Sequence, residues 1–219
     1  MSFSLIIFDY DGVLIDSLDD AVAVSREFCR SVSHDRLPTR ETIKSLENMT
    51  YFELARSVGF QSEQVERFAS HVFEGFQTIG PSMAFFPEIE SLLHGIALKN
   101  IAIVSGNARN VISAKLAAHG LGKKITCIFG AHEPGNKAEK IRNACDHFGV
   151  DAGQACMVGD SVSDIRYAKQ AGVQSVAVLW GWHSQAKLAK EGPDFMVNTV
   201  QELADLIDSE YSTTDSPYA

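Results

Sequence analysis

Two aspartates at the end of a short apolar run constrain this 219-residue chain more than any other feature. Residues 5–8 read Leu-Ile-Ile-Phe, which is typical of a strand buried on both faces of a sheet. Asp9 and Asp11 follow, and Gly12 allows a sharp turn of the backbone. Two carboxylates at a buried strand end are costly unless a cation or a proton lies between them. The segment therefore indicates either a site for a charged ligand or an Asp-rich turn.

Apolar runs alternate with amphipathic helical segments from residue 101 onward. This alternation predicts βαβ units and a parallel sheet. Two of the helical segments stop at Gly120 and Gly149, since glycine commonly follows the last turn of a helix. The predicted strands are residues 5–8, 101–104, 125–129, 155–158 and 175–179.

The stretch between residues 17 and 84 has helical patterns and no convincing strand. The run from Thr50 to Glu53 has the pattern of a capping box that opens a helix. Apolar residues then recur at helical spacing between Val65 and Phe76. The predicted domains are an α/β core domain (residues 1–16 and 85–210), an inserted helical domain (17–84) and a flexible tail (211–219).

The net charge indicates which partners are disfavoured, and the cysteine pattern indicates the cellular compartment. The formal net charge of −9 disfavours nucleic acid and anionic membranes as partners. Cys29, Cys127, Cys145 and Cys156 have no C-x-x-C spacing and lie in apolar patterns, so we expect free buried thiols. We find neither a signal peptide nor an apolar stretch of about 18 residues. We therefore expect a cytoplasmic protein without membrane contact.

Groups that can bind an anion occur at two further junctions. Ser105, Gly106 and Asn107 follow the predicted strand 101–104, where a hydroxyl and backbone N–H groups can receive an anion. Lys137 stands just before a predicted helix, where its ammonium can bind phosphate. Taken singly, Ser105 could be an ordinary helix N-cap and Lys137 a solvated lysine.

Asp160 and Asp164 add two more carboxylates directly after the predicted strand 155–158. Taken alone they could be helix caps and turn formers. The carboxyl ends of parallel strands share one edge of a sheet, and open α/β sheets bind ligands there. Together with Asp9 and Asp11, these acids suit a hard divalent cation, and Mg²⁺ fits a site that also binds phosphate.

In this order the four elements resemble the signature motifs of the haloacid dehalogenase superfamily of phosphohydrolases. The resemblance is to the phosphoglycolate phosphatase-like branch, which has a helical cap, and it spans about residues 3–208. It implies a haloacid dehalogenase-like Rossmannoid parallel sheet with the inserted helical domain as the cap. The matching segments are residues 8–17 for the first motif, 104–107 for the second, Lys137 for the third, and 158–161 with Asp164 for the fourth.

The resemblance also implies roles for the catalytic residues. Asp9 would attack phosphorus and form an aspartyl-phosphate, and Asp11 would protonate the leaving oxygen and then deprotonate the hydrolytic water. Ser105 and Lys137 would hold the phosphoryl oxygens, with Gly106 and Asn107 completing the phosphate-binding set.

The implied cofactor is Mg²⁺. Its ligands would be Asp9, the backbone carbonyl of Asp11, and Asp160. Asp164 would bind it through water or support its ligands.

Several positions depart from the family pattern or leave alternatives open. Val13 stands where many members have threonine, and the third motif lacks the usual Lys-Pro pair, which leaves Lys140 as an alternative to Lys137. Tyr51 stands about where some phosphosugar members carry a basic residue. His132 and His183 lie near the motifs, and we interpret them as a solvated loop residue and a structural residue.

We therefore predict a Mg²⁺-dependent phosphatase that hydrolyses a small phosphomonoester metabolite, phosphoglycolate-like or similar, through an aspartyl-phosphate. The alternative is a phosphosugar mutase of the β-phosphoglucomutase type, which uses the same elements but calls for more basic groups on the cap. A dehalogenase is disfavoured because it has no use for the acid/base group of Asp11. The cap argues against a phospho-receiver, because a signalling surface must stay open to partners. The filled catalytic positions argue against a catalytically silent interaction protein. The expected partner is a small phosphorylated metabolite, and the expected state is a monomer or homodimer.

Overall fold

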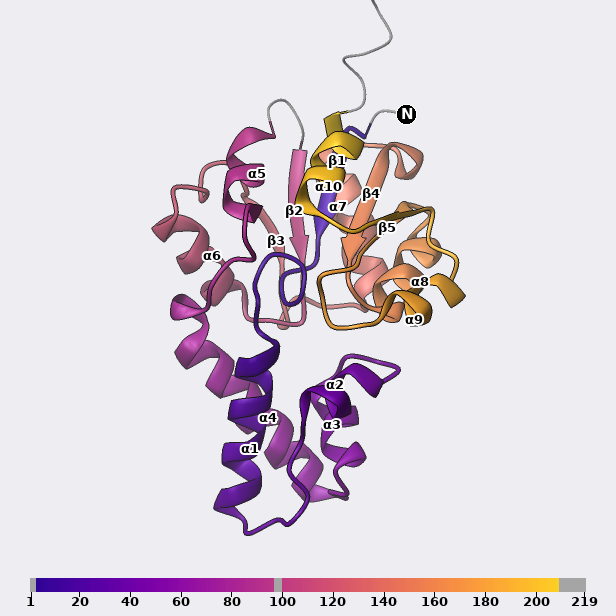
Figure 1. Ribbon diagram of the computed structural model, residues 1–219. Helices are drawn as coiled ribbons and strands as arrows, with labels where there is room; N and C mark the ends of the chain where they lie inside the picture. The colour runs from indigo at the N-terminus through magenta and orange to yellow at the C-terminus, as the bar shows by residue number, and fades with distance from the viewer. Residues whose placement is uncertain (1–2, 97–99, 209–219) are drawn as a thin grey trace, which may run out of the picture.

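A six-stranded parallel sheet, in the order β3-β2-β1-β4-β5-β6, forms the centre of the molecule (Figure 1). The computed structural model describes residues 3–96 and 100–208. The sheet and its flanking helices confirm the predicted α/β fold. The strands are β1 (Leu5–Phe8), β2 (Asn100–Val104), β3 (Cys127–Phe129), β4 (Ala155–Gly159), β5 (Gln174–Val178) and β6 (Phe195–Val197).

The sequence predicted five of these strands but not β6. Two of the three residues of β6, Phe195 and Met196, are only half-buried, so the strand has no continuous apolar run to identify it. It pairs with β5 at the edge of the sheet, with Val176 opposite Phe195. The predicted flexible tail, residues 211–219, lies outside the described residues.

Helices cover both faces of the sheet. Every residue of β1 is buried, and since side chains alternate along a strand, both of its faces are covered. Leu5 and Ile7 pack towards α7 and α8, whereas Ile6 and Phe8 pack towards α5, α6 and α10. The helices that follow the inserted segment are α5 (Ile89–Gly95), α6 (Arg109–Ala118), α7 (Lys137–Phe148), α8 (Val162–Ala171), α9 (Gln185–Lys190) and α10 (Val200–Asp208).

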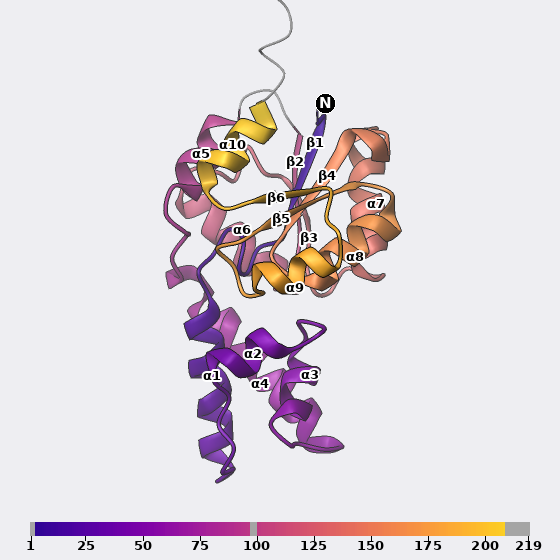
Figure 2. The ribbon, with the colours of Figure 1, turned by 45° about the vertical axis from the view of Figure 1, so that its right-hand side comes forward.

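The inserted segment contains helices and no strand of the sheet. These helices lie together below the carboxyl edge of the sheet in both views (Figures 1 and 2). Three aromatic rings, Phe28, Phe60 and Phe68, pack with centroids 5.5 Å apart in their centre. The division into a core domain and a cap domain stays a prediction. The helices are α1 (Leu18–Ser31), α2 (Arg40–Ser45), α3 (Tyr51–Ser57) and α4 (Glu63–Ile79).

The predicted capping box at α3 is only half formed. The Thr50 side chain accepts a hydrogen bond from the Glu53 N–H, as predicted. The Glu53 carboxylate does not return to Thr50, and instead accepts from the N–H groups of Glu47 at 2.8 Å and Asn48 at 3.0 Å. The reason is that the Thr50 N–H already donates to the Asn48 carbonyl. The Glu53 side chain therefore binds the segment before α3 rather than the backbone of Thr50, the N-cap residue of α3.

All four cysteines are buried and none of them forms a disulfide, as predicted. None of the described helices combines the length and the apolar character that a membrane crossing needs.

Gly149, at the C-terminal end of α7, is the position where the fold most simply requires glycine. Its φ is +61° and no atom lies within 4 Å of an added Cβ, so conformation and not space is the constraint. We expect Gly149→Ala to lower the free energy of unfolding by about 1 kcal/mol, because the left-handed region is unfavourable for alanine. Urea unfolding measures this. Gly153→Ala is the control, since Gly153 has open space and no left-handed φ; an equal loss in both variants would contradict the prediction.

Candidate active site

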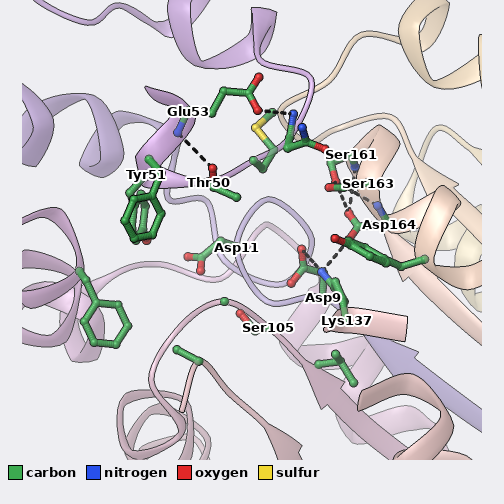
Figure 3. A pocket seen from close by; sticks show the side chains of 18 of the residues that line it. Asp9, Asp11, Thr50, Tyr51, Glu53, Ser105, Lys137, Ser161, Ser163 and Asp164 are labelled. Carbon is green, nitrogen blue, oxygen red and sulfur yellow. Dashed lines mark hydrogen bonds and ion pairs between the residues drawn. The ribbon is translucent and has the colours of Figure 1, made fainter. Parts of the chain in front are cut away.

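The strand order brings the predicted site residues to one edge of the sheet. β1 lies between β2 and β4, so Asp9, Ser105 and Asp160 follow three adjacent strands. All three line a cleft of about 990 Å³ between this edge and the inserted helices, and Lys137 and Asp164 line it too (Figure 3). The topology thus places the carboxylates, the hydroxyl and the ammonium around one cavity.

Lys137 forms ion pairs with two of the acids (Figure 3). Its Nζ lies 2.6 Å from Asp164 Oδ1 and 3.0 Å from Asp9 Oδ2. Burial alone would lower the pKa of Lys137, but the two carboxylates outweigh this effect and raise it. The ammonium is therefore charged at neutral pH and is held at fixed positions by two carboxylates.

The two carboxylate oxygens of Asp164 are held by different elements, one by Lys137 and the other by the start of α8. Its Oδ2 accepts from the Ser161 N–H at 3.0 Å and from the Ser161 hydroxyl at 2.7 Å, while its Oδ1 faces Lys137. The Asp164 N–H in turn donates to Ser161 Oγ, which completes a capping box. Both carboxylate oxygens of Asp164 therefore have protein partners.

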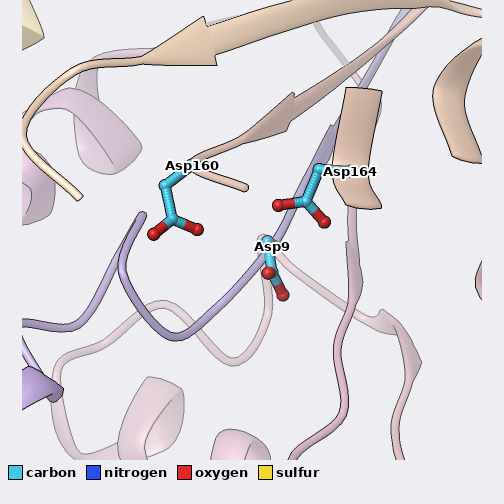
Figure 4. Close-up of side chains that lie close together, drawn as sticks. All are labelled: Asp9, Asp160 and Asp164. Carbon is cyan, nitrogen blue, oxygen red and sulfur yellow. The ribbon is translucent and has the colours of Figure 1, made fainter. Parts of the chain in front are cut away.

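Three carboxylates gather where a cation could be held (Figure 4). One ligand oxygen each from Asp9, Asp160 and Asp164 lies within 4.8 Å of the others. Burial raises the pKa of Asp9 to about 7, with the Asp164 charge adding to the rise and Lys137 opposing it. Burial and the charges of the other two acids likewise raise the pKa of Asp160. Hard oxygen donors that repel one another in a buried site fit a divalent cation such as Mg²⁺.

Two glycines confine the Asp160 carboxylate. Its Oδ2 accepts from the Trp182 N–H at 2.7 Å. A Cβ added to Gly12 would lie 2.2 Å from Asp160 Oδ2, and one added to Gly181 would lie 2.3 Å from Asp160 Cβ. The chain after β5 and the turn after Asp11 therefore approach the carboxylate so closely that only glycine fits.

Asp11 lies at the cleft with a single amide contact. Its Oδ2 accepts from Asn107 Nδ2 at 3.2 Å. Burial raises the pKa of Asp11 to about 6, and the neighbouring Ser17 and Asn107 side chains partly offset the rise. A carboxyl group with a pKa near neutrality can both give and take a proton, which suits general acid–base chemistry.

The sequence predicted that backbone N–H groups of the turn after β2 can receive an anion, but two of these groups donate to side chains within the turn. Ser105 is buried, and its Oγ accepts from the Asn107 N–H at 3.0 Å. The Asn107 side-chain oxygen accepts from the Ala108 N–H at 2.7 Å. Two N–H groups of this turn are therefore already bonded within it, which leaves the Ser105 hydroxyl proton and the Gly106 backbone as the groups that face the cleft.

The alternative lysine has a different environment. Lys140 is buried and its Nζ donates to the Gly130 carbonyl at 2.7 Å. Lys137, which the sequence would leave solvated if Lys140 took its role, instead contacts Asp9 and Asp164. The geometry thus favours Lys137 as the ammonium that meets a ligand next to Asp9.

The two histidines occupy different places. His132 lines the cleft, with its ring edge-on to Phe73 of α4 at a centroid distance of 5.4 Å. His183 is buried, and its ring contacts Leu46 and Val162. The structural interpretation of His183 therefore agrees with its surroundings, whereas His132 lies at the wall of the cleft.

Two aromatic residues line the cleft, of which the sequence analysis noted Tyr51 as a departure from the family pattern and missed Trp182. Trp182 contacts Asp160 through its backbone, and Tyr51 of α3 also lines the cleft. Burial and the charges of Asp11 and Asp9 raise the pKa of Tyr51, so its phenol stays protonated. A Trp after a strand has no distinctive spacing, so the sequence carried no signal for Trp182.

The chain is similar to a family model, to curated proteins and to solved structures. Residues 6–178 match the family model described as haloacid dehalogenase-like hydrolase. The chain is similar to the phosphoglycolate phosphatase of Synechococcus elongatus, with 26% identity over 90% of this chain and 94% of the relative. It is also similar to that of Aquifex aeolicus, with 26% identity over 94% and 97%. A haloacid dehalogenase-like family protein from Streptococcus pneumoniae has the same fold, with a TM-score of 0.81, 20% identity, and coverage of 93% and 98%.

Because the pKa of Asp9 is raised in the folded protein, we expect the free energy of unfolding to depend on pH. Its pKa rises from 3.8 to about 7 on folding, so the folded protein binds this proton more tightly than the unfolded chain. In cation-free buffer, the free energy of unfolding should therefore fall as pH rises through this window, by at most about 1.4 kcal/mol per pH unit for one proton. We expect Asp9→Asn to have a shallower slope. Urea unfolding of both proteins between pH 5 and 7.5 gives the slopes, and identical slopes would contradict the assignment.

Proposed function

The chain belongs to the haloacid dehalogenase-like hydrolase family, and from this membership we propose that it is a Mg²⁺-dependent phosphatase acting on a small phosphomonoester. One observation carries the proposal. The Asp9 carboxylate lies 3.0 Å from a half-buried, charged lysine in a cleft that also contains Asp11 and Ser105. A nucleophile, a proton donor and two groups for phosphoryl oxygens thus lie around one cavity.

Asp9 is the proposed nucleophile. A carboxylate oxygen of Asp9 forms a bond to phosphorus while the bond from phosphorus to the ester oxygen breaks. Lys137 and the Ser105 hydroxyl donate to the phosphoryl oxygens, because a dianion otherwise repels the attacking carboxylate. The product of this step is an aspartyl-phosphate and an alcohol, and covalent catalysis divides hydrolysis into two easier steps.

Asp11 is the proposed acid and base. In the first step its proton passes to the departing ester oxygen, and in the second it takes a proton from the water that attacks phosphorus. The second step releases inorganic phosphate and restores the Asp9 carboxylate. The pKa of about 6 supports both roles, because the group is available in either protonation state near neutral pH.

Asp9, Asp160 and the Asp11 carbonyl are the proposed holders of Mg²⁺. The ion would supply positive charge next to the phosphoryl oxygens. We assign Asp164 to orienting Lys137, because its Oδ1 lies 2.6 Å from Lys137 Nζ, with any contact to the ion through water.

The proposed substrate is a small phosphorylated acid or alcohol of the phosphoglycolate type. The names of the two curated relatives support this class, and so does the surface that the inserted helices present to the cleft. Among the described residues that line the cleft from these helices, Arg56 is the one cation, next to apolar groups such as Met49 and Phe73. A phosphosugar mutase has to hold a second phosphate, for which this surface offers few bases.

A panel of phosphorylated metabolites, assayed for released phosphate, tests the function. We expect many turnovers on at least one small phosphomonoester. Asp9→Asn should lower kcat by about a thousandfold or more, because an amide cannot form the acyl-phosphate. Activity of this variant within tenfold of the wild type would contradict nucleophilic catalysis. With β-glucose 1-phosphate, rapid formation of glucose 6-phosphate without phosphate release would favour the mutase instead.

Removal of divalent cations tests the cofactor. After exhaustive dialysis against a chelator we expect activity to disappear, because three clustered carboxylates, two of them buried, repel one another and the phosphate without a cation. Excess Mg²⁺ should restore it, which controls for damage during dialysis. Full turnover in the presence of excess chelator would rule out the cofactor assignment.

A further inference from the structure

The inserted helices join the rest of the chain through two segments that lie side by side. The Asp16 N–H donates to the Ala84 carbonyl at 3.0 Å, and the Phe86 N–H donates to the Leu14 carbonyl at 2.9 Å. This pair of segments is the covalent connection between the sheet and helices α1–α4. Every other contact across the cleft is non-covalent and can therefore form or break.

Away from this connection, α2 lies next to α9 (Figure 2). Lys187 of α9 donates through Nζ to the carbonyls of Ser45 at 3.1 Å and Lys44 at 3.5 Å, and also to that of Leu46. The last carbonyls of an α-helix have no partner within the helix, and positive charge is favourable at that end. Lys187 thus supplies hydrogen-bond donors to carbonyls at the C-terminal end of α2.

His183 binds the same end of α2 from a buried position. Its Nε2 lies 2.9 Å from the Leu46 carbonyl, and its Nδ1 lies 3.0 Å from the Val162 nitrogen. The Val162 N–H can only donate, so Nδ1 accepts and the ring proton sits on Nε2, which donates to Leu46. One imidazole therefore connects the inserted helices to the first residue of α8, the helix that carries Asp164.

We propose that His183 and Lys187 are positioning residues that hold the segment between α2 and α3 closed over the cleft. The proposal rests on the proposed function, since the closed segment would cover a substrate bound at Asp9. Residues 48–50 of this segment, which begin two positions after Leu46, line the cleft. The Glu53 carboxylate bonds to the Glu47 and Asn48 N–H groups, so the segment is tied to α3 at its other end.

A nearby exposed ion pair contributes less. Arg166 Nη2 lies 3.4 Å from Glu47 Oε2, but their side chains are 47% and 62% exposed. Exposed pairs of this kind contribute little, because water screens them and both side chains lose freedom. The Lys187 and His183 contacts are directed at carbonyls in a less exposed place, so they carry most of the closure.

Lys187→Met tests the proposal by hydrogen–deuterium exchange of the full chain. We expect exchange in residues 45–50 to become about tenfold faster, because hydrogen bonds from a charged donor are lost. The matched control is Lys190→Met, which removes an exposed lysine from the same helix. Exchange in residues 45–50 equal to that of the wild type and the control would overturn the proposal. Faster exchange throughout the chain would also overturn it, since that would indicate general destabilisation.

The kinetic effect separates positioning from partial unfolding. With a substrate found in the phosphate-release panel, we expect Lys187→Met to raise KM about tenfold and to leave kcat within about threefold, since the core groups are unchanged. A fall in kcat at unchanged KM would indicate fewer active molecules and would count against the proposal. If the wild type releases phosphate from no compound, the proposed function fails. The exchange measurement still decides whether Lys187 holds the segment.

Discussion

Repulsion among buried carboxylates is the constraint on which the rest of the site depends. Asp9, Asp160 and Asp164 lie within 4.8 Å of one another at a buried sheet edge, and burial raises the pKa of the first two. Lys137 supplies a single positive charge to this group. One ammonium cannot neutralise three carboxylates, and the excess of negative charge is what makes the place attractive to a divalent cation.

Close backbone packing keeps these charges from moving apart. Gly12 and Gly181 approach Asp160 within distances that no side chain would allow, and the Trp182 N–H holds its Oδ2. Asp164 is held by the capping box that starts α8. Local structure therefore does two tasks at once, because the contacts that begin a helix also aim a carboxylate at Lys137.

Much of this arrangement could be predicted from the sequence, since each site residue stands directly after an apolar run or before a helix. Parallel strands bring their carboxyl ends to one edge, so the chain order of Asp9, Ser105, Lys137 and Asp160 was sufficient to place them together. β6 could not be predicted because two of its three residues are only half-buried, which leaves no continuous apolar run. The contacts of His183 and Lys187 with Leu46 join residues about 140 positions apart, and no local pattern encodes them.

The nature of the contact between α2 and the core bears on how the cleft can change. Lys187 and His183 bind backbone carbonyls at the C-terminal end of α2 and of Leu46 directly after it, and every residue type supplies such a carbonyl. Substitutions on the segment that follows, including Met49 and Tyr51, alter the wall of the cleft without removing the groups that hold it. The residues that face a substrate can therefore vary while the closing contact persists. In the proposed mechanism, hydrolysis depends on Asp9, Asp11 and Lys137 at the edge of the sheet, so a change in this wall of the cleft leaves the proposed chemical groups in place.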